Sequence, residues 1–123
     1  MEENLYWIWI SKMKHITYED FNTLICSYGS IENIWNLKDQ ELKKCKLKEQ
    51  VIIDLLYSGY RKNLDTINEF NRKNNIEVIN CYDRAYPTKL KKIMNRPILL
   101  YVKGNLNVTK GNCIRNSWFK WVQ

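Results

Sequence analysis

Residues 76–105, IEVINCYDRAYPTKLKKIMNRPILLYVKGN, decide the fold class of this chain. Two apolar runs, at 76–81 and 98–102, are bounded by turn-forming residues and have the length of buried strands. Between them, Thr88 can cap a short helix that Pro97 ends. A strand, a compact connection and a second strand predict the beginning of a parallel sheet in an α/β domain.

The chain before this stretch is predicted to be helical, in short pieces, over residues 1–74, because apolar side chains recur there at helical spacing. Thr17 is placed to cap one helix, Gly29 to end it in a left-handed conformation, and Ser30 to cap the next. The side chains expected to be mostly buried are Trp9, Phe21, Leu24, Trp35, Leu55 and Leu56.

Spacing also predicts which face of each helix turns inward. Residues 5–13 have the pattern of an amphipathic helix, and residues 48–60 that of a later one. In the last helix, which continues to about residue 74, Leu64, Ile67 and Phe70 are expected to face the core.

Composition places the chain among globular proteins and favours polyanionic partners. Twenty Lys and Arg residues against 13 Asp and Glu give a formal charge of +7, and such an excess attracts nucleic acid through its summed field. The Lys-, Asn- and Ile-rich composition is also typical of AT-rich coding sequence, so charge alone is weak evidence. The charge is therefore a reason to look for a nucleic-acid surface.

No pattern in the chain indicates a membrane span, a secretory signal, a metal site or a cofactor. No apolar run approaches the roughly 20 residues needed to cross a bilayer. Residues Cys26, Cys45, Cys81 and Cys113 are spread out, whereas zinc sites use closely paired ligands. We expect four reduced cysteines in a cytoplasmic protein.

Two blocks of sequence follow one another in an informative order. The first is the turn Tyr28-Gly-Ser-Ile-Glu-Asn-Ile-Trp35, and the second runs through residues 77–105. Together they resemble the DprA/Smf family of bacterial DNA-processing proteins, in which a D-x-x-Y-P-x-x-L-x-x-I loop-helix lies between two strands. The matching residues are Tyr28, Gly29, Ser30, Trp35, Asp83, Tyr86, Pro87, Pro97, Lys103 and Gly104.

The resemblance implies a domain organisation and a function. It implies a SAM-like or helix-hairpin-helix-like N-terminal domain over residues 1–74 and the first strands of a Rossmann-like domain over 75–108. Full-length relatives bind single-stranded DNA and load recombinase during natural transformation, and they self-associate. None of this requires an enzyme, and no catalytic residue is expected.

The sequence departs from the family pattern in two places. The hairpin at residues 14–17 has no glycine through which backbone N–H groups could approach a phosphate. The Gly-Ser/Thr-Arg loop expected shortly after Asn105 is also missing, and residues 109–123 diverge. Because Trp118 has the single codon TGG and Phe119 begins with T, a one-base shift forces glycine there and allows Ile-Val-Gly-Ser. We therefore predict that the tail is out of frame and has no designed packing partner.

Lysines are the candidate nucleic-acid contacts, since they supply affinity that does not depend on sequence. A solvated surface is the alternative for each of them, and the alternative for His15 as a general base is a surface or capping role. Trp7, Trp9 and Trp35 could stack on bases, but their spacing favours core packing. The candidate lysines are Lys43, Lys44, Lys46, Lys48, Lys89, Lys91, Lys92 and Lys103.

Three functional hypotheses follow from these observations. The first is a non-enzymatic, single-stranded-DNA-binding protein of the DprA/Smf type, truncated here. The second is a helical module for protein interaction or dimerisation without DNA binding, or a gene fragment without function. The third, a nucleotide-using enzyme, would require a Gly-rich loop, and the chain has only isolated glycines.

Overall fold

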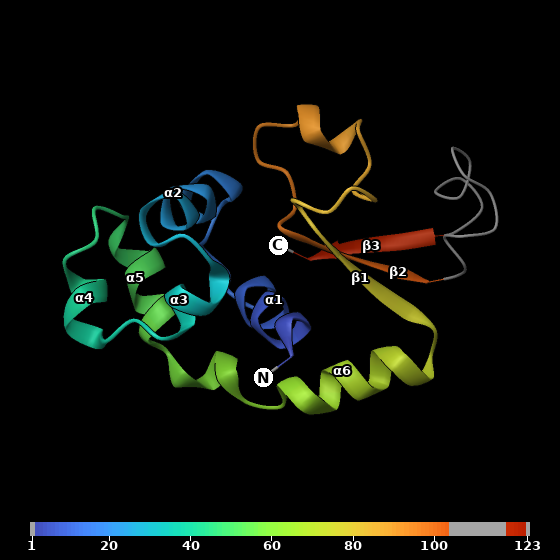
Figure 1. The fold of residues 1–123 in the computed structure, drawn as a ribbon, viewed down its shortest axis with the longest axis horizontal. Helices are drawn as coiled ribbons and strands as arrows, with labels where there is room; N and C mark the ends of the chain where they lie inside the picture. The colour runs from blue at the N-terminus through green and yellow to red at the C-terminus, as the bar shows by residue number, and fades with distance from the viewer. Residues whose placement is uncertain (1, 104–117, 123) are drawn as a thin grey trace.

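The computed structural model describes residues 2–103 and 118–122 and shows an α+β fold, with helices packed against one face of a small sheet (Figure 1). No helix in the described part of the chain is long and apolar enough to cross a membrane. In chain order the elements are α1 (Glu3–Ser11), α2 (Tyr18–Tyr28), α3 (Ile31–Trp35), α4 (Asp39–Lys43), α5 (Glu49–Leu56), η1 (Ser58–Arg61), α6 (Leu64–Lys73), β1 (Ile76–Asn80), η2 (Leu90–Lys92), β2 (Leu99–Lys103) and β3 (Trp118–Val122).

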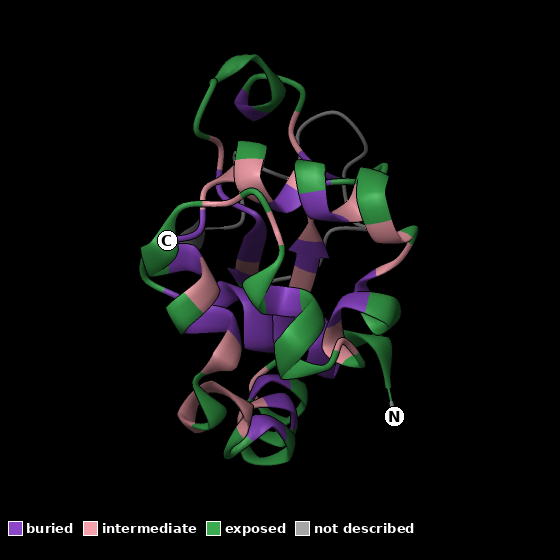
Figure 2. Ribbon diagram, turned by 90° about the vertical axis from the view of Figure 1, so that its left-hand side faces the viewer, coloured by how far each residue is buried: buried purple, intermediate pink, exposed green. Residues whose placement is uncertain are grey.

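Helix α1 lies at the centre of the molecule. It contacts α3, η1 and α6 on one side and β2 on the other, and every residue from Leu5 to Ser11 is buried. Figure 2 shows the buried residues gathered in the middle of the molecule. The predicted helix is therefore present, but its expected polar face is wrong, because a helix that packs against neighbours on all sides has no solvent face to make polar.

The predicted helix ends at α2 and α3 are confirmed. The Thr17 hydroxyl accepts a hydrogen bond from the Asp20 N–H at 3.1 Å, and the Asp20 carboxylate accepts one from the Thr17 N–H at 3.1 Å. Gly29 ends α2 at φ +89°, a conformation that favours glycine. Ser30 caps α3 by accepting from the Asn33 N–H at 3.2 Å.

The predicted burial is confirmed for four of the six named side chains. Trp9, Phe21, Leu24 and Leu55 are buried, whereas Trp35 and Leu56 are only half-buried against the core. Residues 48–60 do not form one helix either, because α5 ends at Leu56 and η1 follows it.

The predicted face of α6 is wrong. Leu64 is buried, Ile67 is half-buried and Phe70 is 59% exposed, whereas Asn68 and Asn71 are buried. At about 100° per residue, positions 64, 68 and 71 stay within about 60° of one another, and position 70 lies about 120° away from 64. Residues spaced strictly three apart therefore drift around the helix, away from the face that contacts its neighbours.

The sheet is antiparallel, in the order β1-β2-β3, which corrects the predicted parallel sheet. The connection from β1 to β2 leaves and re-enters the same end of the sheet, where Asn80 is opposite Leu99. Its only helical piece is η2, whose three residues rise about 6 Å. That is too short to run back along a five-residue strand of about 17 Å, as a parallel pair requires.

Strand β3 pairs with the full length of β2, from Val122 opposite Leu99 to Trp118 opposite Lys103. Our expectation that the tail has no partner is therefore wrong for the backbone of residues 118–122. The frameshift origin of the tail stays a prediction. Gly104 and the remaining residues up to 117 lie outside the described part.

Candidate nucleic-acid interface

The residues of the Asp-x-x-Tyr-Pro motif shape the loop that joins β1 to β2. The Asp83 carboxylate accepts a hydrogen bond from the Ala85 N–H at 2.9 Å, and the Pro87 carbonyl accepts one from the Leu90 N–H at 3.0 Å. Tyr86 is 2% exposed, and its hydroxyl donates to the buried Pro97 carbonyl at 2.8 Å. This bond ties the start of the loop to its end, so the motif residues have a structural role.

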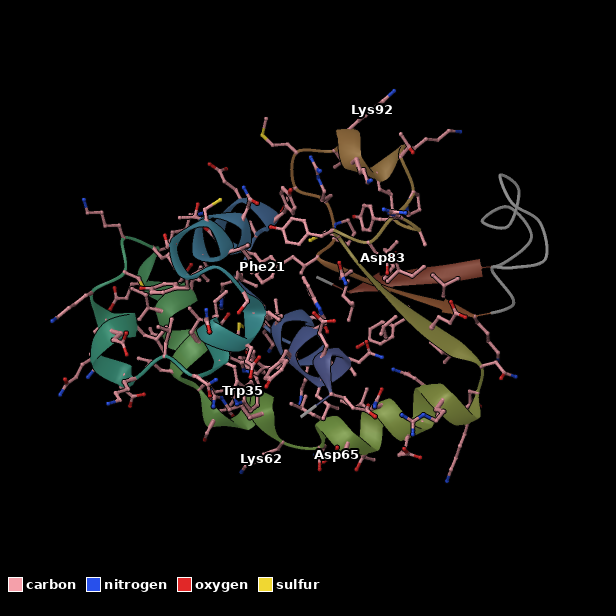
Figure 3. The ribbon with its side chains drawn as sticks, viewed as in Figure 1. Phe21, Trp35, Lys62, Asp65, Asp83 and Lys92 are labelled. Atoms are coloured by element: carbon pink, nitrogen blue, oxygen red, sulfur yellow. The ribbon has the colours of Figure 1, made fainter. Side chains whose placement is uncertain are left out.

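The residues between these anchors carry the positive charge of the loop. Lys89, Lys91 and Lys92 are exposed, and none of them has a carboxylate within ion-pair distance among the described residues. Figure 3 shows Lys92 extending away from the body of the protein. Across residues 82–97, Arg84 and Arg96 add to the three lysines, and Asp83 is the only acidic residue.

The loop that carries these lysines also holds Arg96, which lies against an aromatic ring of α2. The Arg96 guanidinium stacks over the Tyr18 ring at 4.2 Å from its centroid, and the Arg96 Nε donates to the Ile93 carbonyl at 3.1 Å. The Tyr82 ring is 6.4 Å from Tyr18 and remains 45% exposed. Guanidinium planes and exposed aromatic rings are the groups on which unpaired bases stack.

The phenol of Tyr82 is neutral at physiological pH. Burial of part of the ring against Phe21 and Trp7 raises its pKa above the usual value, and its hydroxyl donates to the Asn22 side-chain oxygen at 2.7 Å. A neutral ring beside an arginine does not repel phosphates. We name the surface of Lys14, Tyr18, Tyr82, Lys89, Lys91, Lys92 and Arg96 the basic-aromatic surface.

The other candidate lysines lie elsewhere. Lys43, Lys44, Lys46 and Lys48 are exposed at the corner between α4 and α5, on the left of Figure 1 and away from η2 at its top. Lys103 is exposed at the end of β2, opposite Ile76 on β1. The structure therefore does not join the predicted lysines into one patch.

The first family block also has a structural role. Tyr28 is half-buried, and its hydroxyl lies 3.1 Å from the Cys45 sulfur, while Gly29 and Ser30 form the turn between α2 and α3. Trp35 packs edge-on against Trp9 at 4.9 Å, and the Arg61 guanidinium lies 4.0 Å from the Trp35 ring centroid. Desolvation in this position lowers the pKa of Arg61. Trp7 and Trp9 are buried, so the prediction of core packing is confirmed for them.

His15 is held by Asp54, a residue that the sequence did not single out. The buried Asp54 carboxylate accepts a hydrogen bond from the His15 N–H at 2.9 Å and lies 3.2 Å from the ring Nδ1. The nearby Ser11 hydroxyl donates to the Ile8 carbonyl at 2.7 Å rather than to the His15 ring. The Asp54 contact therefore fixes the hairpin that carries Lys14 and Tyr18 beside the loop.

The described cysteines are free thiols in different environments. Cys26 is exposed, whereas burial raises the pKa of Cys81 to about 12. With iodoacetamide at pH 8, we expect Cys26 to be alkylated in the native protein and Cys81 to react at least about a hundredfold more slowly, because the thiolate is the nucleophile. Peptide mass mapping measures both rates, and denatured protein is the control. Equal rates in the native protein would contradict the burial of Cys81.

Sequence reasoning identified Lys89, Lys91 and Lys92 of this surface but missed Lys14, Tyr18, Tyr82 and Arg96, as well as Asp54. The only available signal was an arginine next to Pro97 and a tyrosine within the first turn of a helix, and neither is specific. Among the described residues, no group of three or more ligating side chains could hold a metal ion. No family model, curated protein or solved structure matches the chain.

Proposed function

We propose that this chain binds single-stranded nucleic acid through the basic-aromatic surface, without catalysing a reaction. The observation that carries the proposal is the Arg96 guanidinium stacked on Tyr18 at 4.2 Å, in a loop that also holds an exposed tyrosine and three lysines without ion pairs among the described residues. Stacking on bases and contacts to phosphates are the two interactions that bind single strands without sequence preference.

Local charge favours this surface over the lysines between α4 and α5. Those lysines share their segment with Asp39, Glu41 and Glu49, whereas residues 82–97 hold one acidic side chain against five basic ones. Nearby carboxylates weaken the attraction for a phosphate, and the corner has no described aromatic pair with an arginine over it. The corner lysines are solvated side chains in this account.

The resemblance to DprA/Smf proteins supports the same function, since the matching Asp-x-x-Tyr-Pro residues build this loop. On that basis we propose a DNA-processing role in the cytoplasm, with single-stranded DNA as the partner, and with recombinase and self-association as further partners of full-length relatives. The three free cysteines of the described part fit a reducing compartment.

Binding is expected to be weak and strongly dependent on salt. Each phosphate contact to a single strand contributes about 0.7 to the slope of log K against log salt. The five basic side chains of the basic-aromatic surface therefore limit the size of this slope to about 3.5. Tight binding that does not change with salt would contradict this reading.

Two matched variants test the proposal. Lys89, Lys91 and Lys92 are replaced by Gln in one, and Lys43, Lys44 and Lys46 in the other, so each loses three positive charges. In fluorescence anisotropy with labelled oligothymidylate at 50 mM salt, we expect the loop variant to bind at least about tenfold more weakly than wild type and the corner variant less than about threefold. Equal losses would show that only net charge matters, and the reverse order would overturn the proposal.

A further inference from the structure

The outer edge of β1 has backbone groups without partners. The Cys81 N–H donates to the Ile98 carbonyl at 2.9 Å, and antiparallel pairing alternates, so Glu77 and Ile79 also turn their backbone groups toward β2. The groups of Ile76 and Val78 therefore point away from the sheet. Among the described residues, neither makes a backbone hydrogen bond on that side.

This edge borders a groove of about 750 Å³. Helix α6 leads directly into β1 and forms the other side of the groove, with the start of α1 beside it (Figure 1). The groove is lined mainly by amides and by the strand itself. Its lining residues are Asn4, Asn68, Asn71, Arg72, Asn75, Ile76, Glu77 and Val78.

One lining side chain is buried with an unmet hydrogen bond. Asn71 is 6% exposed, and its Nδ2 has no hydrogen-bond partner among the described residues. The neighbouring Asn68 is also buried and satisfies its own Nδ2 by donating to Glu2 at 2.6 Å. A buried amide donor without an acceptor is costly, and α6 turns two asparagines rather than apolar residues toward this groove. Both facts indicate a site built for an occupant that supplies hydrogen-bonding groups.

The chemistry of the groove matches a peptide backbone. An added strand offers one N–H and one C=O on alternate residues, which is what the free edge at Ile76 and Val78 requires. Side-chain amides such as that of Asn71 bind the same groups. A nucleic acid is disfavoured here, because Glu77 is exposed at the groove and Arg72 is already paired with Glu69 at 2.7 Å and with Glu2 at 3.3 Å.

Charge defines the peptide further. Glu77 has no ion pair among the described residues, and its partner on β2 is the buried Val102. If a strand were added along the outer edge of β1, a basic residue opposite Glu77 would stabilise its pairing with β1. The half-buried Val78 lies on the other face and favours an apolar neighbour. We propose that the outer edge of β1 binds an extended segment of a partner protein, with a basic residue beside Glu77 and apolar residues flanking it.

Two short peptides test this inference on the full chain. The probes are acetyl-Thr-Val-Lys-Val-Thr-amide and the same peptide with Glu in place of Lys, added to isotopically labelled protein and followed by amide chemical shifts. We expect the Lys peptide to shift the amides of Val78 and its neighbours on β1 and α6. It should bind about threefold to tenfold more tightly than the Glu peptide, and Glu77→Lys should reverse that preference.

A backbone variant separates strand addition from side-chain binding. Because the Val78 N–H points outward, Val78→Pro removes that donor without removing a bond to β2, and proline is tolerated at such edge positions. We expect this variant to stay folded and to lose binding of the Lys peptide. The inference would be overturned if both peptides bound with equal affinity, or if Glu77→Lys did not reverse the preference. Amide shifts at β1 that followed protein concentration alone would also overturn it, because they would show that a second copy of the chain occupies the edge.

Discussion

Replacing Trp9 with Ala is expected to cost about 3–5 kcal/mol of folding free energy. Trp9 is 1% exposed and lies in α1, the helix that contacts both the other helices and the sheet. Its removal leaves a cavity at the centre of the core and breaks the packing against Trp35 and Arg61. Because small domains are stable by only about 5–15 kcal/mol, this loss would remove a large share of the folding free energy.

Urea denaturation followed by circular dichroism measures this loss. Trp9→Phe serves as a graded variant that keeps an aromatic ring and should remain folded if the Ala variant does not. Met94→Ala is the matched surface control, since Met94 is 85% exposed, and its expected change is within about 0.5 kcal/mol. A loss below 1 kcal/mol for Trp9→Ala would contradict the central position of α1.

Replacing Tyr86 with Ala is expected to cost a comparable amount, about 3–5 kcal/mol, because a large buried ring is lost. Tyr86→Phe isolates the hydroxyl. It leaves the buried Pro97 carbonyl without the donor 2.8 Å away, which costs about 1–3 kcal/mol. Both variants should also weaken oligothymidylate binding, because the bond from Tyr86 holds the two ends of the loop that carries the lysines.

Tyr57→Phe provides the control for the loss of a hydroxyl. Tyr57 is 57% exposed, and its hydroxyl makes no hydrogen bond among those of the described residues. The free energy of unfolding of the Tyr57→Phe variant should equal that of wild type within error in the same urea titration. If Tyr86→Phe behaved like Tyr57→Phe, the contact with Pro97 would not hold the loop.

Features fixed by neighbouring residues could be predicted from the sequence. The caps at Thr17 and Ser30 and the left-handed Gly29 depend on local backbone geometry, so local residue patterns identify them. The surroundings of a helix are not local. Phe70 is apolar and well spaced yet exposed, because the direction from which β1 and α1 approach α6 selects Asn68 and Asn71 as the contact face.

The site was predictable only in part for the same reason. The charge of Lys89, Lys91 and Lys92 is visible in the sequence, and so is the motif around Tyr86. The stacking of Arg96 on Tyr18 joins residues 78 positions apart, and the antiparallel return of the chain from β1 to β2 brings them together. A local pattern cannot show such a contact, and the wrong prediction of a parallel sheet would have placed it elsewhere.

The central claim is that the basic-aromatic surface binds single strands. Amide chemical shifts of the full chain, recorded while an unlabelled 12-nucleotide oligothymidylate is added at low salt, test it most directly. We predict that the largest shifts fall on residues 82–97 and 14–18 and fade as salt rises, with little change between α4 and α5. Shifts confined to Lys43, Lys44, Lys46 and Lys48, or no shifts at all, would contradict the claim.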